Sequence, residues 1–238
     1  MKKICICMML CVSILLVSSC GKSSDNSNSQ KQEVTSESKA ENSQTKVQTG
    51  EDILIVYFTR IDNVDKPEEV DAVSSASLIE KDETKYGNTE YIANLIQQSV
   101  GGELLPIKVS EKYSSDYDTT VDRAEKENSE RAYPELDMDM EDIENYSVVF
   151  LGYPNWWYDM PMAMYSFLET YDLSGKTVIP FGTSGGSRFS DSISKIQKMQ
   201  PDATVIEDGF SVSHFDIEDC TVDDVDDWIS SLDVAFNE

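Results

Sequence analysis

The chain alternates short, β-branched apolar runs with segments whose apolar residues recur at helical spacing. Residues 53–58, Ile-Leu-Ile-Val-Tyr-Phe, contain no charged side chain, which is typical of a strand buried on both faces. Further strands are predicted at 104–109, 147–151, 176–181 and 204–212, and helices at 88–100, 119–132, 161–171, 189–199 and 222–234. This alternation predicts an α/β fold with a parallel sheet covered on both faces. Pro106 indicates that the second strand lies at a sheet edge.

The connection between the first strand and the first helix is unusually long. Nearly thirty residues, rich in Asp, Glu, Lys and Ser, separate Phe58 from Asn88. Strand-to-helix loops usually have about 2–6 residues. We therefore predict an insertion, after which the chain returns so that Thr59 and Arg60 lie near Gly87.

The amino-terminal segment predicts export. Lys2 and Lys3 precede the apolar run Ile4–Val17, which is shorter than the roughly 20 residues of a spanning helix. Small residues then lead to Cys20, a pattern that resembles a bacterial lipobox. We expect residues 1–20 to be a lipoprotein signal peptide and Cys20 to carry the lipid. The protein would be lipid-anchored on the extracytoplasmic face of the cell membrane.

The polar composition of residues 21–50 predicts a disordered tether, followed by one folded domain at 51–238. Cys220 would be the only thiol of the mature protein besides Cys20, so no intramolecular disulfide is expected. The chain has 45 acidic and 19 basic residues, a net charge of −26 at pH 7. This charge argues against nucleic acid and against direct adsorption to anionic lipid, leaving the lipid anchor as the membrane contact. With one histidine, His214, a His/Cys metal site is not expected.

Three loops at strand ends have side chains suited to a ligand. The run 152–157, Gly-Tyr-Pro-Asn-Trp-Trp, has flat rings that could cover a planar molecule or simply fill the core. Thr59 and Arg60 with 87–89, Gly-Asn-Thr, could bind an anion at a helix start or merely cap that helix. The loop 182–187, Gly-Thr-Ser-Gly-Gly-Ser, could approach a ligand through its backbone or only make a tight connection. In a doubly wound sheet these loops meet at a topological switch point.

In this order and spacing, the motifs 56–60, 87–89, 152–157 and 182–187 resemble the flavodoxin-like family, over nearly the whole stretch 53–232. The resemblance implies a doubly wound, five-stranded parallel sheet of order 2-1-3-4-5 in a three-layer α/β/α fold. It also implies non-covalently bound flavin mononucleotide (FMN). The protein would transfer electrons to an unidentified redox partner, or act as a small reductase toward quinones or a similar small-molecule acceptor. The implied phosphate contacts are Thr59, Arg60, Asn88 and Thr89. The ring contacts are Pro154, Asn155, Trp156, Trp157, Thr183, Ser184, Gly185 and Gly186.

Two departures from the family pattern concern the same site. The phosphate loop is split by the insertion, and Arg188 stands where such loops often have glycine. The acidic excess also leads us to expect that bound flavin has a lowered reduction potential.

Two alternatives remain open. Gly182–Gly186 fits the pattern Gly-x-Ser-x-Gly, so Ser184 with His214 and an intervening Asp could form an α/β-hydrolase site. The chain could also be an exported binding protein that kept the fold without the flavin. The split phosphate loop favours this second alternative, as does export without a twin-arginine signal, because FMN would have to be captured outside the cytoplasm.

Overall fold

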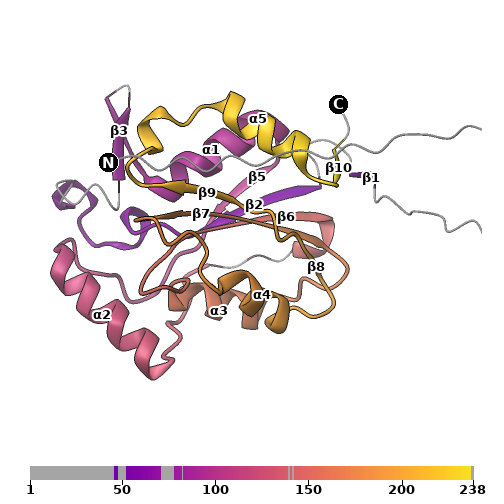
Figure 1. Cartoon of the computed structure of the whole chain (residues 1–238). Helices are drawn as coiled ribbons and strands as arrows, with labels where there is room; N and C mark the ends of the chain where they lie inside the picture. The colour runs from indigo at the N-terminus through magenta and orange to yellow at the C-terminus, as the bar shows by residue number, and fades with distance from the viewer. Residues whose placement is uncertain are drawn as a thin grey trace, which may run out of the picture. The chain divides into compact units, whose positions relative to one another are not determined.

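Two layers of helices sandwich a parallel sheet in the computed structural model (Figure 1). The structure describes residues 46–47, 52–70, 78–81, 83–138, 140 and 142–236, all within a compact unit spanning 43–238. The predicted signal peptide and Cys20 lie outside the described residues. Lys46–Val47, at the end of the predicted tether, form strand β1, which pairs in parallel with β10 (Ala235–Phe236). No helix in the described ranges is long and apolar enough to cross a membrane.

The main sheet has the order β5-β2-β6-β7-β8, with β9 also paired to β7, and all its pairs are parallel. Its strands are β2 (Ile53–Tyr57), β5 (Glu103–Pro106), β6 (Val148–Pro154), β7 (Thr177–Ser184), β8 (Thr204–Val205) and β9 (Phe210–Ser213). Counting β8 and β9 as one interrupted strand gives the predicted order 2-1-3-4-5. Strand β5 lies at one edge, as Pro106 indicated.

The predicted fifth strand is broken into β8 and β9, so the sheet has six strands rather than five. Val178 accepts a hydrogen bond from Ile206 at 2.8 Å, which shows that its carbonyl faces β8. The backbone of Pro180, two residues later, faces the same neighbouring strand. Because proline has no N–H, it cannot continue the ladder of hydrogen bonds there. Pairing resumes at Phe181 with Phe210.

The two faces of β2 pack into separate cores because successive side chains alternate. Ile53, Ile55 and Tyr57 pack with helices α1 (Asn88–Val100) and α5 (Val222–Ser231). Leu54, Val56 and Phe58 face the opposite layer, where α3 (Met162–Thr170) and α4 (Ser192–Met199) lie. Figure 1 shows α1 and α5 on one side of the sheet and α2 (Tyr117–Glu130), α3 and α4 on the other.

The predicted insertion contains short 3-10 helices at Ile61–Asn63 and Pro67–Glu69, then an antiparallel hairpin of β3 (Leu78–Lys81) and β4 (Thr84–Gly87). Further 3-10 turns lie at Ile143–Asn145 and Ile217–Asp219. Buried Asn63 fixes the start of the insertion. Its amide donates to the carbonyls of Thr59 and Ile107, both at 2.9 Å, and accepts from the Val109 N–H at 2.8 Å.

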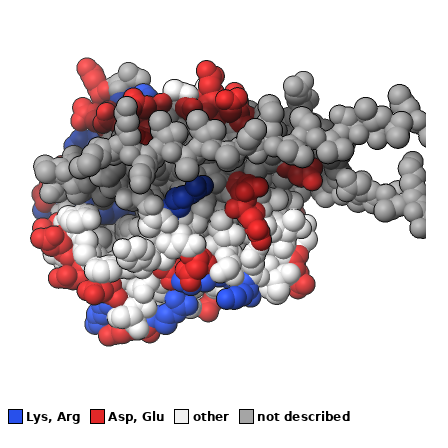
Figure 2. Space-filling view, viewed as in Figure 1, with Lys and Arg blue, Asp and Glu red and all other residues white. Residues whose placement is uncertain are grey.

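Acidic side chains are dispersed around the face shown in Figure 2, with basic side chains among them. They do not gather there into one patch. This dispersed pattern is that of a solvated acidic surface.

Candidate functional site

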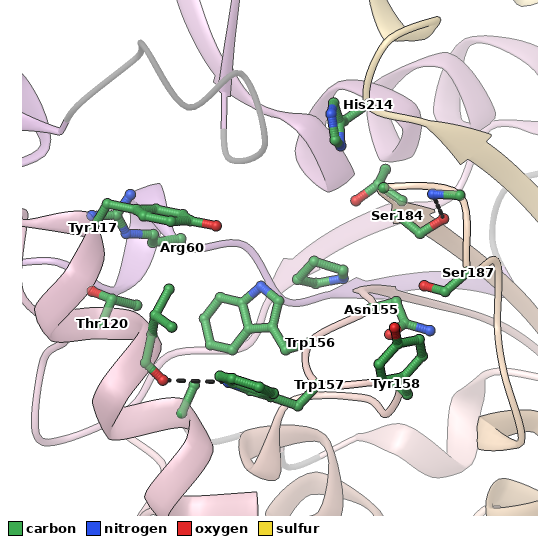
Figure 3. Close-up of a pocket in the computed structure, with 16 residues that line it drawn as sticks. Arg60, Tyr117, Thr120, Asn155, Trp156, Trp157, Tyr158, Ser184, Ser187 and His214 are labelled. Atoms are coloured by element: carbon green, nitrogen blue, oxygen red, sulfur yellow. Dashed lines mark hydrogen bonds between the residues drawn. The ribbon is translucent and has the colours of Figure 1, made fainter.

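The carboxyl ends of β2, β6, β7 and β9 meet helix α2 around a cavity of about 710 Å3 (Figure 3). Arg60 follows β2, residues 154–158 come from the end of β6 and the following turn, residues 183–187 from the end of β7, and His214 follows β9. Four residues of α2 complete the lining: Tyr117, Thr120, Val121 and Ala124. This is the edge at which open parallel sheets bind ligands.

Nine of the twelve predicted contact residues line this cavity. They are Arg60, Pro154, Asn155, Trp156, Trp157, Thr183, Ser184, Gly185 and Gly186. The three predicted loops therefore converge, although the insertion separates the two halves of the first one.

The other three predicted residues, Thr59, Asn88 and Thr89, do not line the cavity. Each is at most 2% exposed, and the Thr89 and Thr183 hydroxyls lie 3.2 Å apart. Thr59 is adjacent to Gly87, because a Cβ at Gly87 would overlap the Thr59 hydroxyl. The insertion thus returns the chain where the sequence predicted, but these side chains lie behind the cavity wall.

At the amino terminus of α1, one backbone N–H is already bonded to a side chain of the same helix. The Gly87 N–H donates to the Glu90 carboxylate at 2.9 Å, so this N–H is not offered to an anion. Burial raises the pKa of Glu90, and the hydrogen bond from Gly87 opposes that shift.

A tight turn presents the two aromatic residues that follow Trp156. Trp156 and Asp159 exchange backbone hydrogen bonds at 2.8 and 3.0 Å, and the residues between them, Trp157 and Tyr158, have φ of 52° and 60°. Positive φ at both central positions is the signature of a type I′ turn, which usually requires Asn or Gly. Two bulky residues therefore adopt an unfavourable backbone conformation where their rings border the cavity. Trp157 is 46% exposed and Tyr158 is 74% exposed.

The two tryptophans are held differently. The Trp156 ring packs edge-on against Phe58 at 5.4 Å and Tyr113 at 5.6 Å, so one edge belongs to the core. The Trp157 indole N–H donates to the Val121 carbonyl of α2 at 3.3 Å (Figure 3). The sequence left open whether this pair fills the core or covers a ligand. Trp156 packs into the core and also lines the cavity.

Asp159, the last residue of the turn, connects the turn to helices α3 and α4. Its carboxylate is buried and accepts from Lys195 of α4 at 2.7 Å and from the Tyr165 hydroxyl of α3 at 2.9 Å. Arg131, at the end of α2, lies 3.6 Å away. Burial alone would lower the pKa of Lys195, but its bonds to Asp159 and Asp191 raise that pKa above its ordinary value.

The loop after β7 is organised by Ser184. Its hydroxyl accepts from the N–H groups of Gly186 at 3.2 Å and Arg188 at 2.9 Å. Arg188 has φ of 51°, a backbone conformation that glycine adopts most readily. Asn155 joins this loop to the β6 turn by donating to the Arg188 carbonyl at 2.7 Å. The Asn155 Oδ1 atom is buried and has no hydrogen-bond partner in the described part of the chain.

A family model for flavodoxin matches residues 83–232, well over half of the chain. The chain belongs to the flavodoxin family. A search of curated proteins gives no match.

Solved structures agree with this assignment. A Bacteroides eggerthii protein, provisionally assigned as a flavoprotein, is 30% identical over 70% of this chain and 93% of its own, with a TM-score of 0.52. A Bacteroides uniformis protein with the same provisional assignment is 24% identical over 77% and 100%, with a TM-score of 0.57. A Lactobacillus acidophilus flavoprotein in complex with FMN is 22% identical over 76% and 99%, with a TM-score of 0.50. The last two similarities establish the fold alone.

Seven cavity residues are not among the cofactor contacts predicted from the sequence of this flavodoxin-family chain: Tyr117, Thr120, Val121, Ala124, Tyr158, Ser187 and His214. The four on α2 occur at i, i+3, i+4 and i+7, so their helical spacing was a detectable signal. What the sequence did not reveal is that this face of α2 faces a cavity.

The arrangement does not support the hydrolase alternative. The Ser184 hydroxyl accepts hydrogen bonds from its own loop, and among the described residues no hydrogen bond joins this hydroxyl to the His214 side chain. His214 lies instead beside Gly185, with Cε1 3.4 Å from the position of a Cβ there. Nor does any cluster of three or more His, Cys, Asp or Glu residues suited to a metal ion occur in the ranges that the structure describes.

Proposed function

We propose that this flavodoxin-family protein binds FMN non-covalently in the cavity and transfers electrons. The observation that carries the proposal is the convergence of Arg60, Trp156 and Gly185, from three separate strand ends, around one space. The FMN complex of the Lactobacillus acidophilus flavoprotein supports it.

The lining fits a flavin in size and chemistry. Its volume of about 710 Å3 is within the range of roughly 300–1,000 Å3 of small-molecule sites. Tryptophan rings provide flat apolar walls, and the unpartnered Oδ1 of Asn155 is an acceptor suited to the single ring N–H of a flavin. When bound, FMN would supply the redox chemistry, while the protein holds the ring and excludes water.

The charge of the lining also fits. Within the described residues no Asp or Glu lines the cavity, whereas Arg60 does, despite the net charge of −26. We assign the phosphate to the side of the cavity that Arg60 lines. The lowered reduction potential expected from the acidic excess would then depend on surface charges, which salt screens.

We further propose that the chain is a lipoprotein, anchored through Cys20 on the extracytoplasmic face of the cell membrane. The charged start, the apolar run and the small residues before Cys20 support this proposal. Mass spectrometry of the native protein would test it. A diacylglyceryl group on Cys20 is expected, and an intact amino terminus would contradict the proposal.

The decisive experiment on cofactor binding is a visible spectrum of the purified protein before and after adding FMN. We expect one FMN per chain, with an absorption spectrum that reversibly bleaches on anaerobic reduction. Gly185→Leu would add a side chain at a position with no positive φ and should weaken FMN binding at least ten-fold. Lys198→Leu, which places the same side chain at an exposed position of α4, is the control.

A protein that is isolated empty and rejects added FMN would overturn the proposal. The exported, flavin-free binding protein would then be the better description, and Gly87 donating to Glu90 instead of to an anion would be its structural basis.

A further inference from the structure

Three side chains in contact lead from the cavity through the core to α2. Trp156 lines the cavity, and its ring centroid lies 5.6 Å from that of buried Tyr113. The interplanar angle of 84° is that of a T-shaped aromatic contact. The Tyr113 hydroxyl donates to the Glu127 carboxylate at 2.8 Å. Tyr113 therefore touches a ring of the cavity wall on one side and a carboxylate of α2 on the other.

Glu127 belongs to a second cavity. Together with Arg123 it lines a polar space of about 390 Å3 that shares no lining residue with the first cavity. Arg123 also orients the carboxylate, because its Nε donates to Oε1 of Glu127 at 2.7 Å and leaves Oε2 to Tyr113. The path from Trp156 through Tyr113 to Glu127 thus connects two cavities that different faces of α2 line.

The surroundings of Tyr113 favour the loss of an electron and a proton together. Burial, reinforced by the charge of Glu127, raises the pKa of the Tyr113 phenol well above its ordinary value, so the phenol is neutral at pH 7. The Arg123 guanidinium lies 4.0 Å from the ring centroid and disfavours a positive charge on that ring. An electron therefore leaves the ring only when the phenolic proton leaves too, and Glu127 is placed to accept that proton.

We propose that Tyr113 is a relay that removes oxidising equivalents from Trp156. When a one-electron oxidant in the first cavity takes an electron from the Trp156 indole, Tyr113 returns one electron to that ring. The Tyr113 O–H bond breaks, and its proton forms an O–H bond with Glu127. Trp156 is restored, leaving a neutral phenoxyl radical at Tyr113 and a neutral Glu127. One electron from a one-electron reductant then restores Tyr113, and Glu127 returns the proton.

This activity goes beyond the proposed function and needs no flavin, so it is tested on the full chain freed of FMN. The chain has three tryptophans, and Trp157→Phe with Trp228→Phe leaves Trp156 alone. Pulse radiolysis in azide solution generates azide radicals, which take one electron from indole. Transient absorption of this parent protein should show the indolyl radical decaying as the phenoxyl radical forms, at a rate independent of protein concentration. Tyr113→Phe should remove this phase.

Glu127→Gln tests the proton acceptor. Glutamine has the same size, but its amide does not take the proton, so phenoxyl formation should slow at least ten-fold. Heavy water should slow the same step in the parent protein. Glu130→Gln is the matched control, because Glu130 lines the second cavity and makes no hydrogen bond to Tyr113 in the described part of the chain. It should leave the rate unchanged.

Tyr171→Phe controls for the loss of a phenol. Tyr171 packs against the same core, and its ring contacts Phe167 rather than Trp156. Within the described residues, Trp156 with Tyr113 is the one ring contact between a tryptophan and a tyrosine. Tyr171→Phe should therefore leave the transfer rate unchanged.

Each outcome decides the proposal. Equal indolyl decay in the parent protein and in Tyr113→Phe would refute the relay. A decay that slows in Tyr113→Phe, but not in Glu127→Gln or heavy water, would refute the role of Glu127. If circular dichroism shows that Tyr113→Phe does not fold, the parent protein decides, because it must form phenoxyl and must do so more slowly in heavy water. None of these results bears on FMN binding, which the visible spectrum decides separately.

Discussion

Replacing Asp159 by Asn tests how the aromatic turn is held. The carboxylate is only 4% exposed and contacts Lys195 at 2.7 Å, the Tyr165 hydroxyl at 2.9 and 3.1 Å and the Met160 N–H at 2.9 Å. Asparagine keeps the shape and one acceptor but removes the charge. It also turns an N–H2 group toward the Lys195 ammonium, so two donors face each other.

The size of the effect follows from the burial of both partners. Breaking a fully buried ion pair from one side costs about 3–5 kcal/mol. The Lys195 side chain is 25% exposed and keeps a second partner, Asp191 at 2.9 Å, so we expect about 2–3 kcal/mol. For a domain of this size that corresponds to a fall of about 4–12 °C in melting temperature.

Asp191→Asn is the matched control, because it removes a carboxylate from the same lysine on the surface. The Asp191 side chain is 64% exposed, and such pairs contribute about 0–1 kcal/mol. Thermal melts of both variants should be compared at pH 7 in low and high salt. Salt should abolish the small effect of Asp191→Asn and spare most of the effect of Asp159→Asn. Equal melting temperatures for the two variants would refute the reasoning.

Three further predictions concern backbone strain, packing and pH. Tyr158→Gly should stabilise the FMN-free protein by about 1 kcal/mol, because glycine removes the left-handed strain, and a lower melting temperature would contradict this. Gly87→Ala should destabilise the protein by about 1–3 kcal/mol, since the new Cβ overlaps the Thr59 hydroxyl; an unchanged urea midpoint would show that the hairpin can move. Hydrogen bonds from Thr119 lower the pKa of Asp116, the cap of α2, so its stabilisation is lost as the pH falls through that lowered pKa. Asp116→Asn, which caps without titrating, should reduce the loss of stability below about pH 4, measured by urea titration.

The fold was predictable because its signals are local and repeated. The alternation of apolar strands with regularly spaced helices predicted the α/β fold, and Pro106 indicated an edge strand. The order of the strands in the sheet came from the family resemblance. The break between β8 and β9 was not predicted, because it arises from Pro180 in the neighbouring strand β7. A sequence scan that treats each strand alone cannot detect a donor missing from its partner.

The predicted helix at 189–199 begins only at Ser192. Arg188 and Ser190 both have φ of 51°, so the chain is still turning where the apolar spacing indicated helix. The loop geometry, set by the bonds to the Ser184 hydroxyl, determines where the helix starts.

The candidate site was predictable at the strand ends and less so elsewhere. The topological rule brought Arg60, Trp156 and Gly185 together. It could not show that Thr59, Asn88 and Thr89 are buried, because burial depends on how the insertion packs. Nor could the topological rule assign the four residues of α2 that line the cavity, since this rule concerns only the ends of strands.

The acidic composition matters for how copies of this protein behave toward one another. The large apolar side chains that the described ranges leave exposed are Trp157, Tyr158 and Phe215. Trp157 and Tyr158 line the cavity, and the Phe215 ring lies 3.9 Å from that of His214, another lining residue. Exposed apolar rings near the cavity opening favour association with an apolar surface of another copy. At pH 7 a net charge of −26 keeps the mouths of neighbouring copies apart. Once acid neutralises the carboxylates that repulsion ends, and self-association should begin at these rings.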